Sequence, residues 1–271
     1  MSQKKLIYML LFVLVVSVLY FIEKYQVPHS STKETSSEVV DKTDVPDTQF
    51  LPTTTTGTIV KHYYYTLSYA EDHEQAEWVA YNLTKDQLSD NDFERPYFEI
   101  DPLVLTQSAD WRNYRNSGYD RGHLCPAGDR RFSHEAYNET FLTSNISPMQ
   151  HDFNSGIWNR LEQKVRSWAQ KYDGVFVVTG GVLKPGLQTI GDEEVSVPEA
   201  FYKIILDADD GTYKVLAFLI PNQPSSNSFY DYTVTVDEIE SLTGIDFFAD
   251  LPDTLETRLE SRVDSKAWGK R

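Results

Sequence analysis

Residues 119–132 read YDRGHLCPAGDRRF and place His123 within a run of arginines. The whole chain is acidic, with a formal net charge of −16, so a local gathering of basic residues needs a reason. Histidine can act as a general base near neutral pH without a large pKa shift, and the planar guanidinium of Arg121 suits phosphate oxygens. Taken alone, however, Arg-Gly-His is more often a packed histidine beside a surface arginine. The stretch therefore leaves a catalytic and a structural interpretation open.

The acidity is unevenly distributed. Residues 191–253 contain 14 acidic residues against 2 lysines, a balance of −12, whereas residues 110–131 contain 5 arginines against 3 aspartates, a balance of +2. Overall acidity argues against tight, passive binding of nucleic acid. It does not exclude a local anion site in the basic stretch.

A second polar cluster lies in residues 143–166, TSNISPMQHDFNSGIWNRLEQKVR. If this segment were one helix, Asn154 and Glu162 would be separated by roughly 12 Å of rise and could not both bind one metal ion directly. We therefore expect Asn154 at the start of the helix, a favoured place for asparagine. Glu162 and Arg166 are one turn apart and can pair as i,i+4 neighbours. A helix cap with a surface ion pair is the structural alternative.

Together the two clusters resemble a known family. D-R-G-H, then S-N-I-S-P, then F-N-S-G-I-W-N-R-L-E with an arginine four residues later are similar to the DNA/RNA non-specific endonucleases. These are the ββα-metal, or His-Me finger, nucleases, which include secreted bacterial sugar-non-specific nucleases and mitochondrial endonuclease G. The recognisable motifs span residues 78–168. The resemblance implies an α+β fold with a central, mainly antiparallel sheet flanked by helices.

The resemblance also implies the catalytic roles. His123 matches the general base that deprotonates the attacking water, and Asn154 matches the sole protein ligand of a divalent metal, Mg²⁺ first and Mn²⁺ second. Glu162 matches the carboxylate that holds metal-bound waters. Asn145 matches an asparagine that supports the architecture of the metal site. One neutral oxygen ligand is reasonable for Mg²⁺, which keeps most of its waters.

The arginines match positions that contact the substrate. Arg121 and Arg166 correspond to arginines near the scissile phosphate and the leaving group, and Arg95 to an upstream phosphate-binding arginine. Arg130 is a further expected substrate contact, and Arg131 could face either substrate or solvent.

Two positions depart from the family pattern. Met149 follows the proline of S-N-I-S-P where many members have glutamine, and Phe141 stands where some relatives carry another active-site asparagine. These departures concern substrate handling, because the core catalytic residues are kept.

The implied activity is single-metal hydrolysis of phosphodiester bonds in DNA and RNA that leaves 5′-phosphate ends. Contacts to phosphate carry no sequence information, which fits a broad substrate range. Two alternatives stay open: a catalytically silent nucleic-acid-binding module on the same fold, and a phosphodiesterase restricted to a narrower substrate such as RNA. Retention of both His123 and Asn154 favours the enzyme over the silent module.

The first 55 residues differ in composition from the rest. An uncharged apolar run at residues 6–22 follows two lysines and approaches the roughly 20 residues of a spanning helix. We expect residues 1–25 to be a signal anchor or signal peptide, residues 26–55 a flexible polar linker, and residues 56–271 the nuclease domain. The protein would then be exported, either anchored in the membrane or secreted. The expected partners are DNA and RNA, the membrane, and a second copy of the chain in a homodimer.

Hydrophobic patterns predict strands at residues 59–68, 77–83 and 175–179, and a hairpin from residues 201–206 and 213–221 around an Asp-Gly turn. Helices are predicted at residues 154–171 and 235–243, the second with Thr235 and Glu238 as a capping box and Gly244 as its stop. A helical turn is expected after Thr84. The acidic turn at residues 207–211 lacks the spacing and the distal glutamate of a calcium loop.

The remaining candidates favour structural roles. Cys125 is the only cysteine, so no intrachain disulfide can form, and we expect it to be a buried small residue. Neither CxxC nor paired-histidine spacing indicates structural zinc. Core or surface positions are expected rather than ligand or base-stacking roles for His62, His134, His151, Trp78, Trp111, Trp158 and Trp168.

Overall fold

The computed structural model describes residues 48–209 and 211–269. The apolar run at residues 6–22 and most of the predicted linker lie outside these ranges. Within them, every helix is too short or too polar to cross a bilayer.

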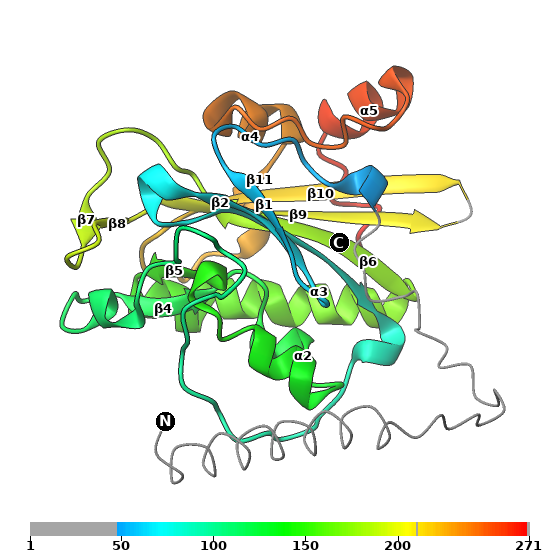
Figure 1. The fold of residues 1–271 in the computed structure, drawn as a ribbon. Coiled ribbons are helices and arrows are strands. Elements are labelled where there is room, and N and C mark those ends of the chain that lie inside the picture. The colour runs from blue at the N-terminus through cyan, green and yellow to red at the C-terminus, as the bar shows by residue number, and fades with distance from the viewer. Residues whose placement is uncertain (1–47, 210, 270–271) are drawn as a thin grey trace, which may run out of the picture. The chain divides into compact units, whose positions relative to one another are not determined.

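An antiparallel sheet forms the centre of the described chain (Figure 1). Its seven strands follow the order β1-β2-β3-β6-β9-β10-β11, and every neighbouring pair is antiparallel. Their bounds are β1 (Thr58–Lys61), β2 (Thr66–Ala70), β3 (Gln75–Thr84), β6 (Gly174–Gly181), β9 (Ala200–Asp209), β10 (Thr212–Pro221) and β11 (Thr233–Val234). The α+β class predicted from the sequence is confirmed.

Among the described residues, two small antiparallel sheets, four α-helices and several short 3₁₀ or π-helical segments lie outside the central sheet. One small sheet pairs β4 (Asp120–His123) with β5 (Ile146–Met149), and the other pairs β7 (Thr189–Ile190) with β8 (Val195–Ser196). The helices are α2 (His134–Glu139), α3 (Asn159–Lys171), α4 (Val236–Thr243) and α5 (Asp253–Glu260).

Apolar side chains that alternate between the two faces of the central strands form a hydrophobic core on each face of the sheet. In β9, Phe201 and Ile205 join the core under α3, whereas Tyr202 and Ile204 join the core under α4 and α5. Figure 1 shows α3 on one side of the sheet and α4 and α5 on the other. Successive side chains of a strand point to opposite faces, and each large apolar side chain buried this way contributes about 1.5–3 kcal/mol. The sheet therefore separates two halves of the molecule.

Most of the predicted elements are present, but one predicted strand is two separate strands. The predicted strand at residues 59–68 is two strands, β1 and β2, because His62 and Tyr65 close a turn with a backbone hydrogen bond of 2.9 Å. Strand formers fill this turn, so composition gives no sign of it. The Asp-Gly hairpin of β9 and β10, the helical turn after Thr84 and the stop of α4 at Gly244 are confirmed. Helices α2 and α5 were not predicted.

Residues near the predicted linker boundary belong to the folded body. The predicted linker extends to residue 55, but the ring of Phe50 packs 5.5 Å from that of Phe176. The carbonyl of Thr53 accepts a hydrogen bond of 2.9 Å from the indole of Trp78. The three-way division of the chain itself stays a prediction.

Candidate active site

The motif Asp120–His123 forms β4, and His123 lies opposite Ile146 in its pairing with β5. Gly122 permits a close approach here, because a Cβ at this position would lie 2.3 Å from the sulfur of Met149. Met149 is buried. The methionine that departs from the family pattern therefore fills the space next to the glycine.

The segment that carries Asn154 and Glu162 is not one regular helix. Phe153–Trp158 forms the π-helical segment η7, which is interrupted at Gly156 (φ −97°, ψ −106°), and α3 begins at Asn159. Asn154 is therefore inside the first helical segment and does not cap a helix, contrary to the sequence-based expectation. Because of this kink, the separation of Asn154 and Glu162 that was estimated for a straight helix does not apply.

A cleft of about 340 Å³ gathers four of the predicted catalytic residues. It is lined by Ser89, Asp90, His123, Pro126, Ala127, Gly128, Arg131, Asn154, Asn159, Glu162 and Arg166. His123 comes from the β4 strand, and the others of the four come from η7 and α3. Asn154 and Glu162 thus border the same cleft although eight positions separate them in the sequence.

Asn154 is oriented by Asp120, which sequence reasoning noted only as a residue that could orient the loop. The Nδ2 of Asn154 donates a hydrogen bond of 3.0 Å to Oδ2 of Asp120, and Nδ1 of His151 lies 3.0 Å from the same oxygen. Because the amide nitrogen is committed to Asp120, the carbonyl oxygen Oδ1 is left as the acceptor of this side chain. A neutral oxygen at the cleft is a suitable ligand for a hard divalent cation.

His123 presents a nitrogen without a protein partner. Its Nε2 is buried and accepts no hydrogen bond from the described residues. The ring packs against Phe141 at 4.9 Å and Phe98 at 5.6 Å between centroids. Burial, followed by the charges of Arg95 and Arg121, lowers the pKa of His123 to about 3. The imidazole is therefore neutral at physiological pH, the form that a general base requires.

Arg95 and Arg121 surround the same aromatic rings. The guanidinium carbon of Arg121 lies 4.8 Å from the ring centre of Phe98, and that of Arg95 lies 5.4 Å from the ring centre of Phe141. Cations are attracted to the faces of aromatic rings. Phe141, the second departure from the family pattern, thus takes part in holding both the histidine and an arginine.

A second cavity continues from the cleft at Asn154. It has a volume of about 560 Å³ and is lined by Arg95, Trp111, Tyr114, Arg115, Asn116, Tyr119, Asp120, Arg121, His151 and Asn154. Trp111 is the one tryptophan of the four candidates that is not fully buried, since Trp78, Trp158 and Trp168 belong to the core. Arginines and an accessible indole make this cavity a continuation of the anion-binding surface.

Glu162 interacts electrostatically with a buried lysine, Lys203, that was not predicted from the sequence. Burial raises the pKa of Glu162 to about 7, Lys203 opposes the shift, Asp129 adds to it, and Arg166 opposes it. Lys203 is fully buried, its Nζ has no hydrogen-bond partner among the described residues, and it lies 4.6 Å from the ring centre of Trp158. Lys203 lies two positions from both Phe201 and Ile205 in β9, so its side chain shares their buried face of the sheet. This spacing was the sequence signal for a buried lysine.

Arg166 pairs with Asp129 rather than with Glu162. Its Nη1 donates a hydrogen bond of 2.6 Å to Oδ1 of Asp129, and the hydroxyl of Tyr81 donates one of 2.9 Å to the other oxygen. The i,i+4 pair expected from the sequence is therefore replaced by a contact to a residue that sequence reasoning did not single out. The buried carboxylate of Asp129 fixes the arginine at the edge of the cleft.

The two neighbouring arginines of the opening motif have different environments. Arg130 is 1% exposed, and its Nη2 donates hydrogen bonds of 2.9 Å to the carbonyls of Tyr64 and Asn82. The expectation that Arg130 contacts substrate is therefore wrong, because its guanidinium is used inside the fold. Arg131 lines the cleft instead.

Asn145 is a buried positioning residue and does not line the cleft. Its Oδ1 accepts a hydrogen bond of 2.8 Å from the backbone N–H of Cys125, and its Nδ2 donates bonds of 3.0 Å and 2.9 Å to the carbonyls of Cys125 and Thr140. These contacts fix the chain directly after His123. Cys125 is buried, as expected, and burial raises the pKa of its thiol to about 12.

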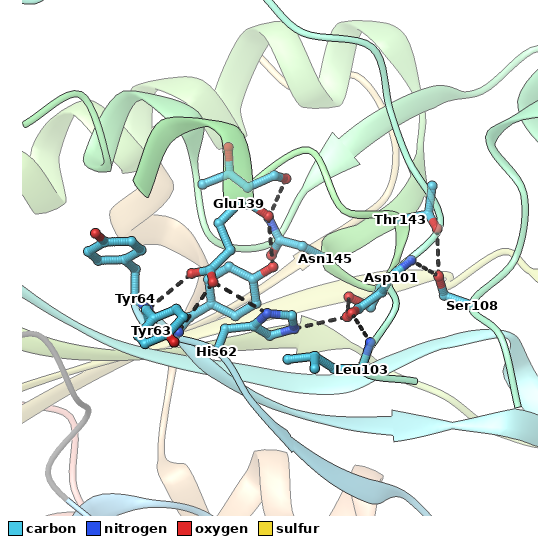
Figure 2. Close-up of polar contacts among 12 residues, drawn as sticks. His62, Tyr63, Tyr64, Asp101, Leu103, Ser108, Glu139, Thr143 and Asn145 are labelled. Atoms are coloured by element: carbon cyan, nitrogen blue, oxygen red, sulfur yellow. Dashed lines mark hydrogen bonds and ion pairs between the residues drawn. The ribbon is translucent and has the colours of Figure 1, made fainter. Parts of the chain in front are cut away.

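A buried histidine network anchors the segments behind this site (Figure 2). The Nε2 of His62 lies 2.9 Å from Oδ2 of Asp101, and its Nδ1 lies 3.5 Å from Oε1 of Glu139. Burial alone would lower the pKa of His62, but hydrogen bonds to Asp101 and Glu139 outweigh it and raise the pKa to about 9. Ser144, the neighbour of Asn145, donates to Asp101. His62 is a core residue, as the sequence indicated.

A sequence profile of the DNA/RNA non-specific endonucleases matches residues 47–254. The chain belongs to the DNA/RNA non-specific endonuclease family. The expected membership is thereby confirmed.

Individual members of the family resemble the chain over most of its length. It is 36% identical over 199 residues to the mitochondrial nuclease EXOG of Danio rerio, covering 67% of this chain and 58% of that protein. It is 34% identical over 216 residues to a nuclease of Nostoc sp., covering 74% of this chain and 77% of that protein. The chain thus spans less than two thirds of the EXOG length.

The solved structure of the EndoG/EndoGI complex contains a similar fold. The match has a TM-score of 0.69 and 28% sequence identity and covers 80% of this chain and 94% of that one. The human mitochondrial endonuclease G is 32% identical over 198 residues, covering 68% of this chain and 67% of that protein. This likeness supports the large antiparallel sheet with flanking helices.

These relatives contradict the predicted export. EXOG and endonuclease G are named as mitochondrial, which points away from a secreted or membrane-anchored protein. The expected membrane partner and homodimer likewise find no support. An apolar run after two lysines does not by itself identify the compartment that a chain reaches, so the inference went further than its evidence.

Proposed function

We propose that this protein is a divalent-metal-dependent endonuclease that hydrolyses phosphodiester bonds of DNA and RNA and leaves 5′-phosphate ends. The observation that supports this most strongly is the cleft that His123, Asn154, Glu162 and Arg166 line together. It combines a neutral imidazole, an oxygen ligand, a carboxylate and a fixed cation around one space.

The donor set fits Mg²⁺, with Mn²⁺ as a second choice. Asn154 would hold the ion through Oδ1, since Asp120 binds its nitrogen. Glu162 would accept hydrogen bonds from water around the ion. When bound, such an ion polarises the phosphate and stabilises the charge of the departing 3′ oxygen.

His123 would remove a proton from the attacking water with its imidazole ring. Burial is the main cause of the low pKa of His123, and the two arginines that lower it further are also the residues proposed to contact phosphate. A phosphate group placed between Arg95 and Arg121 offsets their positive charge, so His123 becomes a stronger base when substrate is bound. Substrate binding and base strength are thereby linked.

Arg121, Arg166 and Arg95 would contact the scissile phosphate and its neighbours, with Arg131 as an additional contact in place of Arg130. Fixed positive charge lowers the cost of the extra negative charge in the transition state. The second cavity provides Trp111 and Tyr119, whose rings could stack on bases without reading them. Backbone contacts and stacking together predict low sequence specificity.

Digestion of supercoiled plasmid and of RNA by the full chain tests this proposal. We expect cleavage of both with Mg²⁺, none with EDTA, and loss of cleavage in His123→Ala and Asn154→Ala. His134→Ala is the matched control, because His134 is exposed and lines neither cavity. Cleavage that survives EDTA or His123→Ala refutes the mechanism, and RNA-only cleavage supports the narrower phosphodiesterase.

The chemistry of the product ends is tested separately. Fragments with 5′-phosphate ends accept a radioactive phosphate from a kinase only after treatment with a phosphatase. Direct labelling without that treatment would show 5′-hydroxyl ends and contradict the proposed bond cleavage.

A further inference from the structure

Five carboxylates gather on α4, α5 and the segment between them. They form two overlapping groups, Asp237–Glu240–Glu260 and Asp246–Glu256–Glu260, and within each group one oxygen from every side chain lies within 4.8 Å of the others. Glu260 belongs to both groups. The carboxylates come from two helices and one turn, so the fold brings them together and their spacing in the sequence does not.

Glu260 is the unusual member of this cluster. It is 6% exposed, and its Oε1 is buried without a hydrogen-bond partner among the described residues. Burying a carboxylate without compensation is costly. The buried oxygen therefore needs a positive partner or a proton.

The described protein supplies no cation to the cluster. None of the lysine or arginine salt bridges of the described residues involves these five carboxylates. Among the described residues, the five carboxylates accept one hydrogen bond, of 2.9 Å, from the backbone N–H of Phe247 to Oε1 of Glu240. Asp237 and Asp246 are exposed, so an ion from solvent can reach the buried Glu260.

We propose that Glu260, with Asp237, Glu240, Asp246 and Glu256, binds a calcium ion that fastens α5 to α4. The ligands are all oxygens, which hard cations prefer and softer transition metals do not. Calcium accepts 6–8 oxygens in flexible geometry, whereas magnesium demands a nearly ideal octahedron. A loose arrangement of several carboxylates from separate elements suits the former.

This calcium site is separate from the catalytic cleft. Leu259, the neighbour of Glu260, packs with Val236 and Ile239 in the core beneath α4 and α5. Leu161 and Val165 of α3 belong to the other core, across the sheet (Figure 1). Calcium bound here should therefore stabilise the fold without taking part in hydrolysis.

Thermal unfolding of the full chain, with calcium or magnesium as the only divalent ion at matched ionic strength, tests the proposal. The Asn154→Ala background removes the proposed catalytic ligand, so any remaining response comes from another site. At roughly 100 times Kd, linkage predicts a calcium-dependent rise in Tm of about 5–10 °C. Titration calorimetry in this background should give one calcium per chain.

Glu260→Gln and Asp246→Asn should each abolish most of the rise. Without calcium, Glu260→Gln should be at least as stable as the parent, because it removes a buried charge. Glu238→Gln, an exposed glutamate on α4, is the matched control and should keep the rise. The proposal is overturned if the Asn154→Ala protein shows no rise with calcium, if Glu260→Gln and Asp246→Asn keep it, or if Glu238→Gln loses it equally.

Discussion

Arg130 and Arg131 are adjacent in the sequence but should respond in opposite ways to the same substitution. Methionine at either position removes the guanidinium and keeps a long apolar side chain. At Arg130 this removes the donor of two 2.9 Å hydrogen bonds to the carbonyls of Tyr64 and Asn82 and the cation 4.7 Å from the ring centre of Tyr81. At Arg131 it removes a charge from the cleft.

The structure sets the expected magnitudes. A hydrogen bond from a charged donor contributes about 1.5–3 kcal/mol, so two of them give Arg130→Met a loss of roughly 3–6 kcal/mol in the free energy of unfolding. Arg131→Met should change that free energy by less than about 1 kcal/mol. Loss of one charged phosphate contact should instead lower its kcat/KM by about tenfold to 100-fold.

Urea unfolding and plasmid nicking measure the two effects on the same proteins. Nicking is assayed at a low temperature at which Arg130→Met stays folded, and there its kcat/KM should lie within about threefold of the parent. The reasoning fails if Arg130→Met unfolds within about 1 kcal/mol of the parent protein. It also fails if Arg131→Met loses as much stability as Arg130→Met.

Two further predictions concern His62 and Asp120. The pKa of His62 is raised in the folded state, so its stabilisation is complete below the unfolded value of 6.5 and is lost as pH rises through about 9. At about 1.4 kcal/mol per pKa unit, His62→Asn should lower the free energy of unfolding, measured with urea, by up to ~3 kcal/mol near pH 6 and by little near pH 10. An equal loss at both pH values would contradict the assignment. Asp120→Ala should release the amide of Asn154 and raise the Mg²⁺ concentration needed for half-maximal plasmid nicking by about 10–100-fold. An unchanged half-maximal Mg²⁺ concentration would rule out the orienting role.

The family resemblance of the motifs, and not residue type and spacing alone, was needed to predict which residues line the cleft. His123, Asn154 and Glu162 could be identified because each motif keeps its chemistry within a few positions of the chain. The class of fold followed from the same motifs and from period-2 alternation in strands such as β9. These features are local, so they can be read without coordinates.

The residues that support the cleft could not be predicted in the same way. Asp129 fixes Arg166 across 37 positions, and Asn154 reaches Asp120 across 34, so both contacts depend on tertiary structure. Lys203 was hidden because a lysine in a strand usually faces solvent. The turn at His62 was missed because strand-forming residues fill it.

The central claim is that His123 removes the proton from the attacking water, and chemical rescue tests it most directly. The initial rate of plasmid nicking in Mg²⁺ is measured for His123→Ala with and without added imidazole. We expect a loss of about 10²–10⁴-fold that neutral imidazole partly restores, since the removed ring leaves space beside Phe98 and Phe141. A His123→Ala protein that nicks within about tenfold of the parent rate would contradict the account.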